Sequence, residues 1–276
     1  MQRVVASRGM ASTQLLIMHF IIETYTRPFD FPVPATPPAS CTYMLATVPR
    51  TGSTYLCHRL WRTGCLGAPL EYLNPVFYEP AMQWESCADL ETYWRQVRSR
   101  RSSPNGVFGW KMFTPSYVRI AEQTPVLLPR IAPDHVIYLT RRDKIEQAVS
   151  YAMAIDSGAW FSGADHTTQP SYSREAVERA LRMIEQQEQS WQRIFERTTC
   201  SYLPVYYEDV IADWQRAVRS IADFCGVSLG AELDALPHVP LPDKQGDRTN
   251  HEWVEEYRRC AEVAGTRRAE AAETPG

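Results

Sequence analysis

The hydrophobic pattern of the chain changes period abruptly after residue 48. Tyr43 to Val48 form a short apolar run of the kind that a buried parallel strand needs, and Pro49 ends it. Leu56 and Leu60, four residues apart, then give the following segment the apolar face of a helix. Gly52 lies between the two segments, where a turn requires it. The pattern predicts a strand, a tight turn and the start of a helix.

The same pattern recurs later in the chain. Pro133 to Thr140 are a second buried strand, and Ile145, Val149 and Ala152 mark a helix directly behind it, which Gly158 is placed to end.

The rest of the chain alternates between the two kinds of element. Because strands that alternate with helices form parallel sheets covered on both faces, we predict an α/β fold with a mainly parallel sheet flanked by helices. Ligands of such sheets bind beyond the carboxyl ends of the strands. Strands are predicted over Val107–Phe113 and Tyr202–Tyr206, and helices over Asp89–Ser99, from a Ser173 cap to Phe195, from Asp209 to a Gly226 C-cap, and from Trp253 to near Ala264.

The turn after the first strand is suited to an anion. The first turn of a helix has unpaired N–H groups and the positive end of the helix dipole, and Arg50, Ser53 and Thr54 add side-chain donors. A Walker A loop would need a second glycine and a lysine, so ATP is not the first expectation. The plainer interpretation is an ordinary turn.

Composition limits the partners. The net charge of −3 and the pI near 6.1 of the 276-residue chain argue against a general binder of nucleic acid or of anionic membranes. The apolar run from Leu15 to Ile22 is too short for a bilayer span, so we expect no stable membrane anchor. Seven cysteines without a Cys-x-x-Cys pair predict a reducing, cytoplasmic location and no metal site. We expect an N-terminal extension over residues 1–40, a single domain over 41–265 and a frayed tail over 266–276.

Several motifs, taken in their order along the chain, resemble those of a known family. Arg-Thr-Gly-Ser-Thr-x-Leu-Cys begins at Arg50, Gly-x-Pro-x-Glu-Tyr ends at Tyr72, and Arg-Arg-Asp-Lys-x-x-Gln-Ala-Val-Ser ends at Ser150. The first resembles the 5′-phosphosulfate loop of sulfotransferases, and Arg142 with Ser150 resembles their 3′-phosphate site. Over roughly residues 43 to 258 the chain is most similar to bacterial carbohydrate sulfotransferases of the trehalose 2-sulfotransferase type.

This resemblance implies a fold related to P-loop nucleotide kinases, with 3′-phosphoadenosine-5′-phosphosulfate (PAPS) as sulfuryl donor, PAP as product and no metal. It implies Glu71 as the general base and Arg50 as the group that stabilises the leaving phosphate. By its residue type alone His58 is a rival base, but its position on the helix beside Cys57 and Arg59 favours a partly buried structural role. It further implies a carbohydrate or other small alcohol as acceptor, near Glu71, Tyr72 and Lys111, and a homodimer. The residues expected to bind PAPS are Arg50, Thr51, Gly52, Ser53, Thr54, Arg142, Ser150, Lys244 and Gln245.

Three questions stay open from the sequence. Arg141 could exchange roles with Arg142, and Lys111 could either line the site or pair with an acid. The alternative functions are a phosphoryl transferase built on the same loop and a non-catalytic nucleotide-binding module.

Overall fold

The computed structural model describes residues 29–32, 41–84, 86–158, 160, 171–198, 201–242, 246 and 248–272, with side chains of the last helix described to residue 260. The chain divides into two compact units. The first consists of Met1–Arg142 and Gln186–Pro242, and the second of Asp143–Glu185 and Asp243–Gly276.

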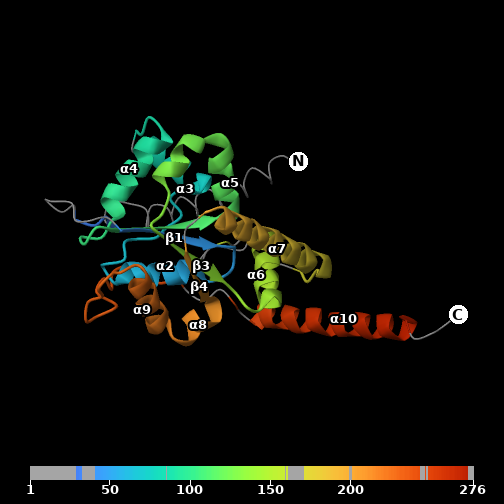
Figure 1. Ribbon diagram of the computed structural model, residues 1–276. Coiled ribbons are helices and arrows are strands. Elements are labelled where there is room, and N and C mark those ends of the chain that lie inside the picture. Colours follow the sequence, from blue (N-terminus) through green and yellow to red (C-terminus); the bar gives the residue numbers. More distant parts are fainter. Residues whose placement is uncertain are drawn as a thin grey trace, which may run out of the picture. The chain divides into compact units, whose positions relative to one another are not determined.

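A parallel sheet forms the centre of the first unit (Figure 1). Its four strands lie in the order β2-β1-β3-β4, and every neighbouring pair is parallel. The predicted α/β class and mainly parallel sheet are therefore confirmed. The strands are β1 (Cys41–Thr47), β2 (Val107–Phe113), β3 (His135–Thr140) and β4 (Tyr202–Tyr206).

Helices cover both faces of this sheet, which is why β1 is buried over six of its seven residues. In Figure 1, helices α2 (Ser53–Arg62), α8 (Tyr207–Ala212) and α9 (Trp214–Phe224) lie on one face. Helices α3 (Pro75–Trp84), α4 (Leu90–Arg101) and α5 (Thr114–Gln123) lie on the other, and a 3₁₀ turn, η2 (Pro125–Arg130), follows α5.

The two faces have different cores. On the α2 side, aliphatic side chains from the sheet meet Leu56, Leu60 and Ile221. On the other side the packing is aromatic: the Trp94 ring of α4 lies edge-on to Trp110 of β2, with ring centroids 5.3 Å apart. Both arrangements bury large apolar surfaces and hold the strand ends in fixed register.

Two helices of the first unit were not predicted, and one was predicted as continuous but is broken. Helices α3 and α5 are short, and α3 contains Pro80 in place of a clear apolar period. The helix predicted from Asp209 is interrupted at Asp213, whose carboxylate accepts a hydrogen bond from the Arg216 N–H and so begins α9.

The second unit is helical. It contains α6 (Lys144–Ser157), α10 (Arg248–Ala272) and the first part of α7 (Arg174–Arg197), which continues into the first unit from Gln186. As predicted, Gly158 ends α6 with φ 70° and Ser173 caps α7. The last helix runs to Ala272, past the end predicted near Ala264.

Part of the predicted N-terminal extension packs on the first unit. The Phe29 ring lies 5.6 Å from that of Trp61, and the Asp30 carboxylate forms a 3.0 Å ion pair with Arg101. The predicted limits of the domain, at residues 41 and 265, stay predictions.

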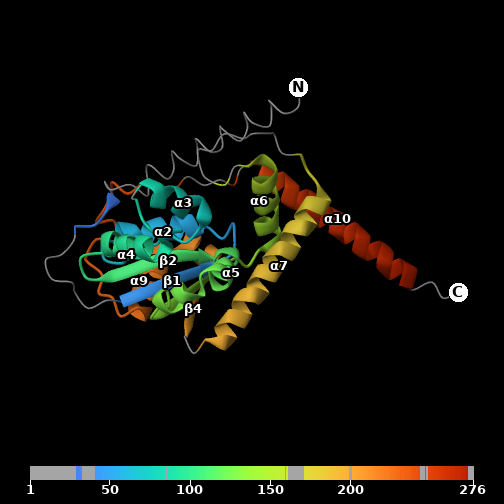
Figure 2. The same ribbon diagram turned by 90° about the horizontal axis from the view of Figure 1, so that it is seen from above.

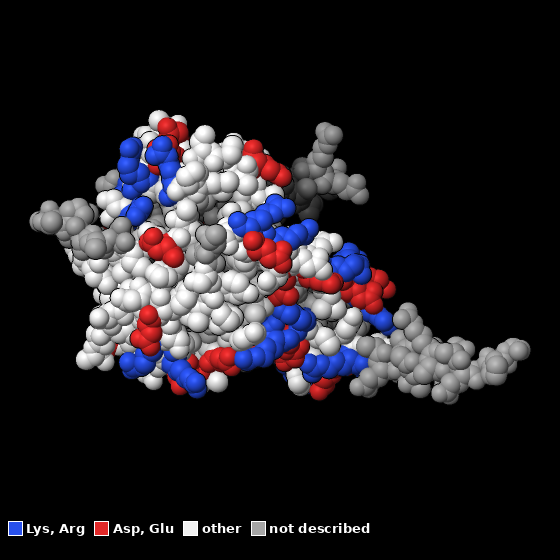
Figure 3. Space-filling model, viewed as in Figure 1, with Lys and Arg blue, Asp and Glu red and all other residues white. Residues whose placement is uncertain are grey.

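Figures 2 and 3 complete the description. Figure 2 shows α4 lying across β2 and β1 when the sheet is seen from above. Figure 3 shows Lys and Arg side chains interleaved with Asp and Glu on the face viewed. Of the helices that the structure describes, none has the length and apolar character needed to cross a bilayer.

Candidate active site

The turn between β1 and α2 exposes the start of a helix at the carboxyl edge of the sheet. Arg50 and Gly52 both have positive φ, 67° and 70°, so the chain reverses within three residues. A Cβ at Gly52 would lie 2.6 Å from the Tyr207 ring, which leaves room for glycine alone. Among the described residues no side chain caps α2, and its first turn holds no acid. This helix end therefore favours a bound anion.

Two arginines lie beside this turn. The pKa of the Arg50 guanidinium is lowered to about 10, chiefly by burial and also by the neighbouring positive charge of Arg141, while Tyr207 acts in the opposite direction. The Arg141 guanidinium stacks over the Tyr207 ring, 4.4 Å from its centroid. Tyr207, the first residue of α8, thus contacts the site, and its only signal in the sequence was that of an aromatic residue after a strand. Two like charges held this close favour a multiply charged anion between them.

The hydroxyl groups of the turn have different roles. Thr51 is buried, and its hydroxyl donates to the Val48 carbonyl at 3.1 Å and lies 2.7 Å from the Thr47 hydroxyl, so it holds the turn in shape. Ser53 is buried at the first position of α2, and Thr54 follows it.

A buried carboxylate, that of Glu71, is connected to the start of α2 through the side chain of Lys111. Glu71 is 7% exposed and forms a 2.8 Å ion pair with Lys111 of β2, which is 4% exposed. The Lys111 ammonium also donates to the Thr54 hydroxyl at 3.1 Å. Lys111 therefore does both things that the sequence left open: it pairs with an acid, and it connects that acid to the anion-binding turn.

The Glu71 carboxylate has a second donor, Asn74, whose side-chain nitrogen lies 2.8 Å from the other carboxylate oxygen. Asn74 precedes α3, a helix that the sequence did not predict, and so was missed with it. Tyr72 is buried in the core with its hydroxyl donating to the Ala68 carbonyl, so it supports the Glu71 turn and leaves the predicted acceptor role without support.

The residues predicted to bind the 3′-phosphate are Arg142, Ser150, Lys244 and Gln245. Arg142 is exposed: its guanidinium forms two hydrogen bonds to Asp209, at 2.8 and 2.6 Å, and its pKa is raised by that carboxylate. Ser150 lies on α6 in the second unit. Lys244 and Gln245 fall outside the described residues. The structure thus places Arg141 beside Arg50, and the 3′-phosphate role of Arg142 stays a prediction.

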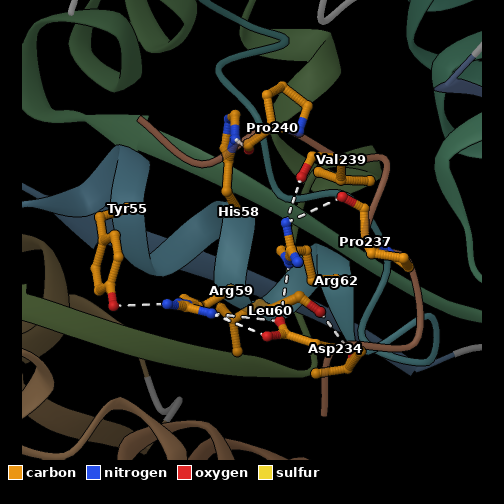
Figure 4. Close-up of polar contacts among 10 residues, drawn as sticks. Tyr55, His58, Arg59, Leu60, Arg62, Asp234, Pro237, Val239 and Pro240 are labelled. Atoms are coloured by element: carbon orange, nitrogen blue, oxygen red, sulfur yellow. Dashed lines mark hydrogen bonds and ion pairs between the residues drawn. The ribbon is translucent and has the colours of Figure 1, made fainter. Parts of the chain in front are cut away.

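His58, the rival base, joins α2 to the segment that contains Pro240 (Figure 4). Its Nδ1 donates to the Pro240 carbonyl, and burial lowers the pKa of the imidazole to about 4. In the same view Arg62 donates to the Asp234 carboxylate at 2.8 Å and to the Val239 carbonyl at 2.8 Å. His58 is therefore neutral near pH 7 and engaged in packing.

Within the part of the chain that the structure describes, no group of three or more His, Cys, Asp or Glu side chains is placed to hold an ion.

Comparison with known proteins identifies relatives of this chain. The profile of the Stf0 sulphotransferase family matches residues 42–260. A protein of Mycolicibacterium smegmatis described as trehalose 2-sulfotransferase is 26% identical over 262 residues, covering 81% of this chain and 96% of that protein. A protein of Mycobacterium tuberculosis with the same description is 25% identical over 256 residues, covering 78% of this chain and 94% of that protein.

Solved structures show more distant likenesses. A sulfotransferase from Alicyclobacillus acidocaldarius is 15% identical with a TM-score of 0.42, covering 80% of this chain and 92% of that one. A mouse sulfotransferase complexed with PAP is 14% identical with a TM-score of 0.41, covering 72% of this chain and 63% of that one. The assignment of this chain to a family depends on the profile match.

Proposed function

The chain belongs to the Stf0 sulfotransferase family and is a sulfotransferase, and on that premise we propose that it moves a sulfuryl group from PAPS to a hydroxyl of trehalose or a similar carbohydrate. The observation that carries this proposal is the link from Glu71 through Lys111 to Thr54. It connects a buried carboxylate to the first turn of the helix whose N-terminus favours an anion.

The proposed reaction needs one group to take a proton and others to receive negative charge. An acceptor hydroxyl is a poor nucleophile, so a base within hydrogen-bond reach must remove its proton as the oxygen attacks sulfur. Glu71 is the proposed base. The bond between sulfur and the bridging oxygen breaks at the same time, and charge develops on the 5′-phosphate.

Arg50 and the N–H groups at the start of α2 are the groups proposed to stabilise that charge. A guanidinium presents fixed, parallel donors to phosphate and sulfonate oxygens, and in a buried site its charge acts through little intervening water. The neighbouring Arg141 adds a second positive charge. These residues fit a phosphosulfate, because no described side chain caps α2, its first turn holds no acid, and the two arginines lie beside it.

The rest of the donor site is a prediction. Arg142, Ser150, Lys244 and Gln245 are proposed to bind the 3′-phosphate, on the strength of the family resemblance alone. The acceptor is proposed from the two relatives described as trehalose 2-sulfotransferases. A cytoplasmic location agrees with the free cysteines of the described residues, and the homodimer follows from the resemblance.

Thermal unfolding tests the donor first. PAP at about 100 times its dissociation constant should stabilise the protein by about 2.7 kcal/mol without added metal. Mg²⁺-dependent stabilisation by ATP, with none by PAP, would contradict the proposal and favour the phosphoryl-transferase alternative.

Glu71→Gln then tests the base, with PAPS and trehalose as substrates. The glutamine carbonyl can still accept a hydrogen bond from Lys111, so the variant should fold and bind PAP as the wild type does. We expect kcat to fall about 10²–10⁴-fold, because the proton acceptor is lost. Since a buried lysine without its acid is destabilising, Glu71→Gln combined with Lys111→Met serves as a control with both charges removed. Full transfer activity in Glu71→Gln would show that the protein is a sulfotransferase with another base, whereas PAP binding without transfer in the wild type would favour the non-catalytic module.

A further inference from the structure

We propose that Asn74 is a positioning residue that fixes the direction of the Glu71 carboxylate toward the acceptor hydroxyl. This inference rests on the proposed function, in which Glu71 is the base. The proposal begins from the contacts of Asn74, which no motif singled out. Its side-chain nitrogen lies 2.8 Å from Glu71 Oε2, and its backbone N–H donates to the Glu71 carbonyl at 3.0 Å. The two residues therefore close a tight turn on each other.

The orientation of the Asn74 amide is determined by its two partners. Its side-chain oxygen accepts a hydrogen bond from the Val76 N–H at 3.2 Å, in the first turn of α3. A backbone N–H can only donate and a carboxylate can only accept, so the amide oxygen must face Val76 and the amide nitrogen must face Glu71. Asn74 thus caps α3 through its side-chain oxygen, and this contact fixes the side-chain nitrogen that donates to Glu71.

The Glu71 carboxylate is held from its other side as well. The Lys111 ammonium lies 2.8 Å from Glu71 Oε1, and the backbone N–H of Lys111 donates to the Leu70 carbonyl at 2.9 Å. The strand β2 and the Glu71 turn are therefore joined through both backbone and side chain. Tyr72 and Leu73, both 1% exposed, anchor the same turn in the core. A carboxylate with a donor on each oxygen cannot rotate freely. This arrangement meets the geometric demand of a general base.

The charges near Glu71 come from more than one element. Lys111 faces it from β2, and Cys57 lies near both from α2, while His58, also on α2, interacts with Lys111. Burial raises the pKa of Cys57 to about 12 and lowers the pKa of His58 to about 4, so both are neutral near pH 7. Asn74 is a neutral donor in this group, and replacing it by a carboxylate would place a second negative charge beside the base.

Two substitutions separate the donor from the helix cap. Serine and aspartate are both good N-cap residues, so Asn74→Ser and Asn74→Asp should keep α3 and melt within a few degrees of the wild type. Neither offers a donor like the amide nitrogen, and the aspartate repels Glu71. Asn105→Ser is the matched control: Asn105 also uses both ends of its amide, donating to the Cys65 carbonyl and accepting from Ser103, and it contacts no charged group of the site.

The experiment measures kcat, KM and the pH profile of transfer from PAPS to trehalose. We expect kcat to fall about 10–100-fold in Asn74→Ser, with KM for PAPS unchanged, because the base is misdirected and the donor site is intact. In Asn74→Asp the acid limb of the kcat profile should move to higher pH, because a second carboxylate makes protonation of Glu71 easier. Asn105→Ser should leave both unchanged.

The outcomes are distinguishable. A wild-type kcat and pH profile in both Asn74 variants, in a wild-type enzyme that does transfer sulfuryl groups, would overturn this inference and leave the proposed function standing. A matching loss in Asn105→Ser would reduce the effect to general destabilisation and overturn it too. A wild-type enzyme that binds no PAP and sulfates no acceptor would remove the proposed function, and the inference with it.

Discussion

The two ends of helix α2 use arginine in opposite ways. At its C-terminal end, Arg59 and Arg62 both reach the Asp234 carboxylate, at 3.2 and 2.8 Å, and Arg62 also donates to backbone carbonyls (Figure 4). At its N-terminal end, Arg50 lies beside Arg141, and each charge disfavours the other. The helix dipole favours cations at the first of these ends and anions at the second.

This difference shows what the two groups are for. The two arginines at the C-terminal end share one acid, Asp234, and fasten its segment to the helix. At the N-terminal end the positive charge of Arg141 lowers the pKa of Arg50, and the positive φ of Arg50 is a strained conformation for a residue with a side chain. An anion at this end would be attracted by the helix dipole and by both guanidinium groups, which is the physical argument for the proposed donor site.

Removing one arginine from each end gives the largest expected contrast. Arg50→Ala should reduce kcat for sulfuryl transfer about 10²–10³-fold and abolish stabilisation by PAP, because a donor to the leaving phosphate is lost. Arg50→Lys keeps the positive charge but loses the parallel donors of the guanidinium. Its kcat and its stabilisation by PAP should therefore lie between those of the wild type and those of Arg50→Ala. Transfer kinetics and melting curves with and without PAP measure both effects.

Arg59→Ala is the matched control for that comparison. Arg59 contacts Asp234 and lies 4.0 Å from the centroid of the Trp214 ring, so its loss should lower the melting temperature without changing the PAP-induced shift. Equal loss of PAP binding in both variants would contradict the assignment of the two ends.

A pair of glycines tests the backbone of the donor site. Gly52 and Gly226 have nearly the same φ, 70° and 66°, but a Cβ at Gly52 meets the Tyr207 ring while one at Gly226 meets nothing within 4 Å. Gly226→Ala should cost about 1 kcal/mol of stability from the backbone alone. Gly52→Ala should cost about 3 kcal/mol, since the clash adds to it, and should also weaken PAP binding. Denaturant unfolding of both variants measures the difference; equal costs would show that the Tyr207 contact does not constrain the turn.

Much of this site could be predicted from local sequence. The turn after β1 was found because an apolar run, a glycine and a helical period follow one another within a few residues, and each is a local signal. Glu71 was found through the motif that it shares with the resembled family. Both predictions were drawn from patterns of neighbouring residues, and the role of Glu71 as the base stays a prediction.

The partners of those residues could not be predicted, because they depend on tertiary contacts. Tyr207 reaches Gly52 only through the pairing of β4 with β3, and Lys111 reaches Glu71 only through the position of β2 beside β1. Successive residues at a strand end point in different directions, so the sequence left Arg141 and Arg142 open. The structure separates them: Arg141 lies over Tyr207, and Arg142 binds Asp209.

The smallest expected effect concerns His58, at the side of α2 that packs on the Pro240 segment. Its pKa is lowered from 6.5 to about 4 by burial, so in the native state it stays neutral while the unfolded chain takes up a proton below pH 6.5. The unfolded state then binds more protons, and stability falls as the pH drops from 6.5 toward 4. At pH 5 the expected loss is about 2 kcal/mol relative to pH 8.

His58→Asn isolates this contribution, because the asparagine nitrogen can still donate to the Pro240 carbonyl and the side chain does not titrate. Urea unfolding of both proteins from pH 8 to pH 4.5 should therefore show a shallower decline in the variant, and transfer activity at pH 7.5 should be similar in the two. Parallel declines would mean that His58 is protonated in the native state, and a large loss of activity at pH 7.5 would return it to consideration as a base.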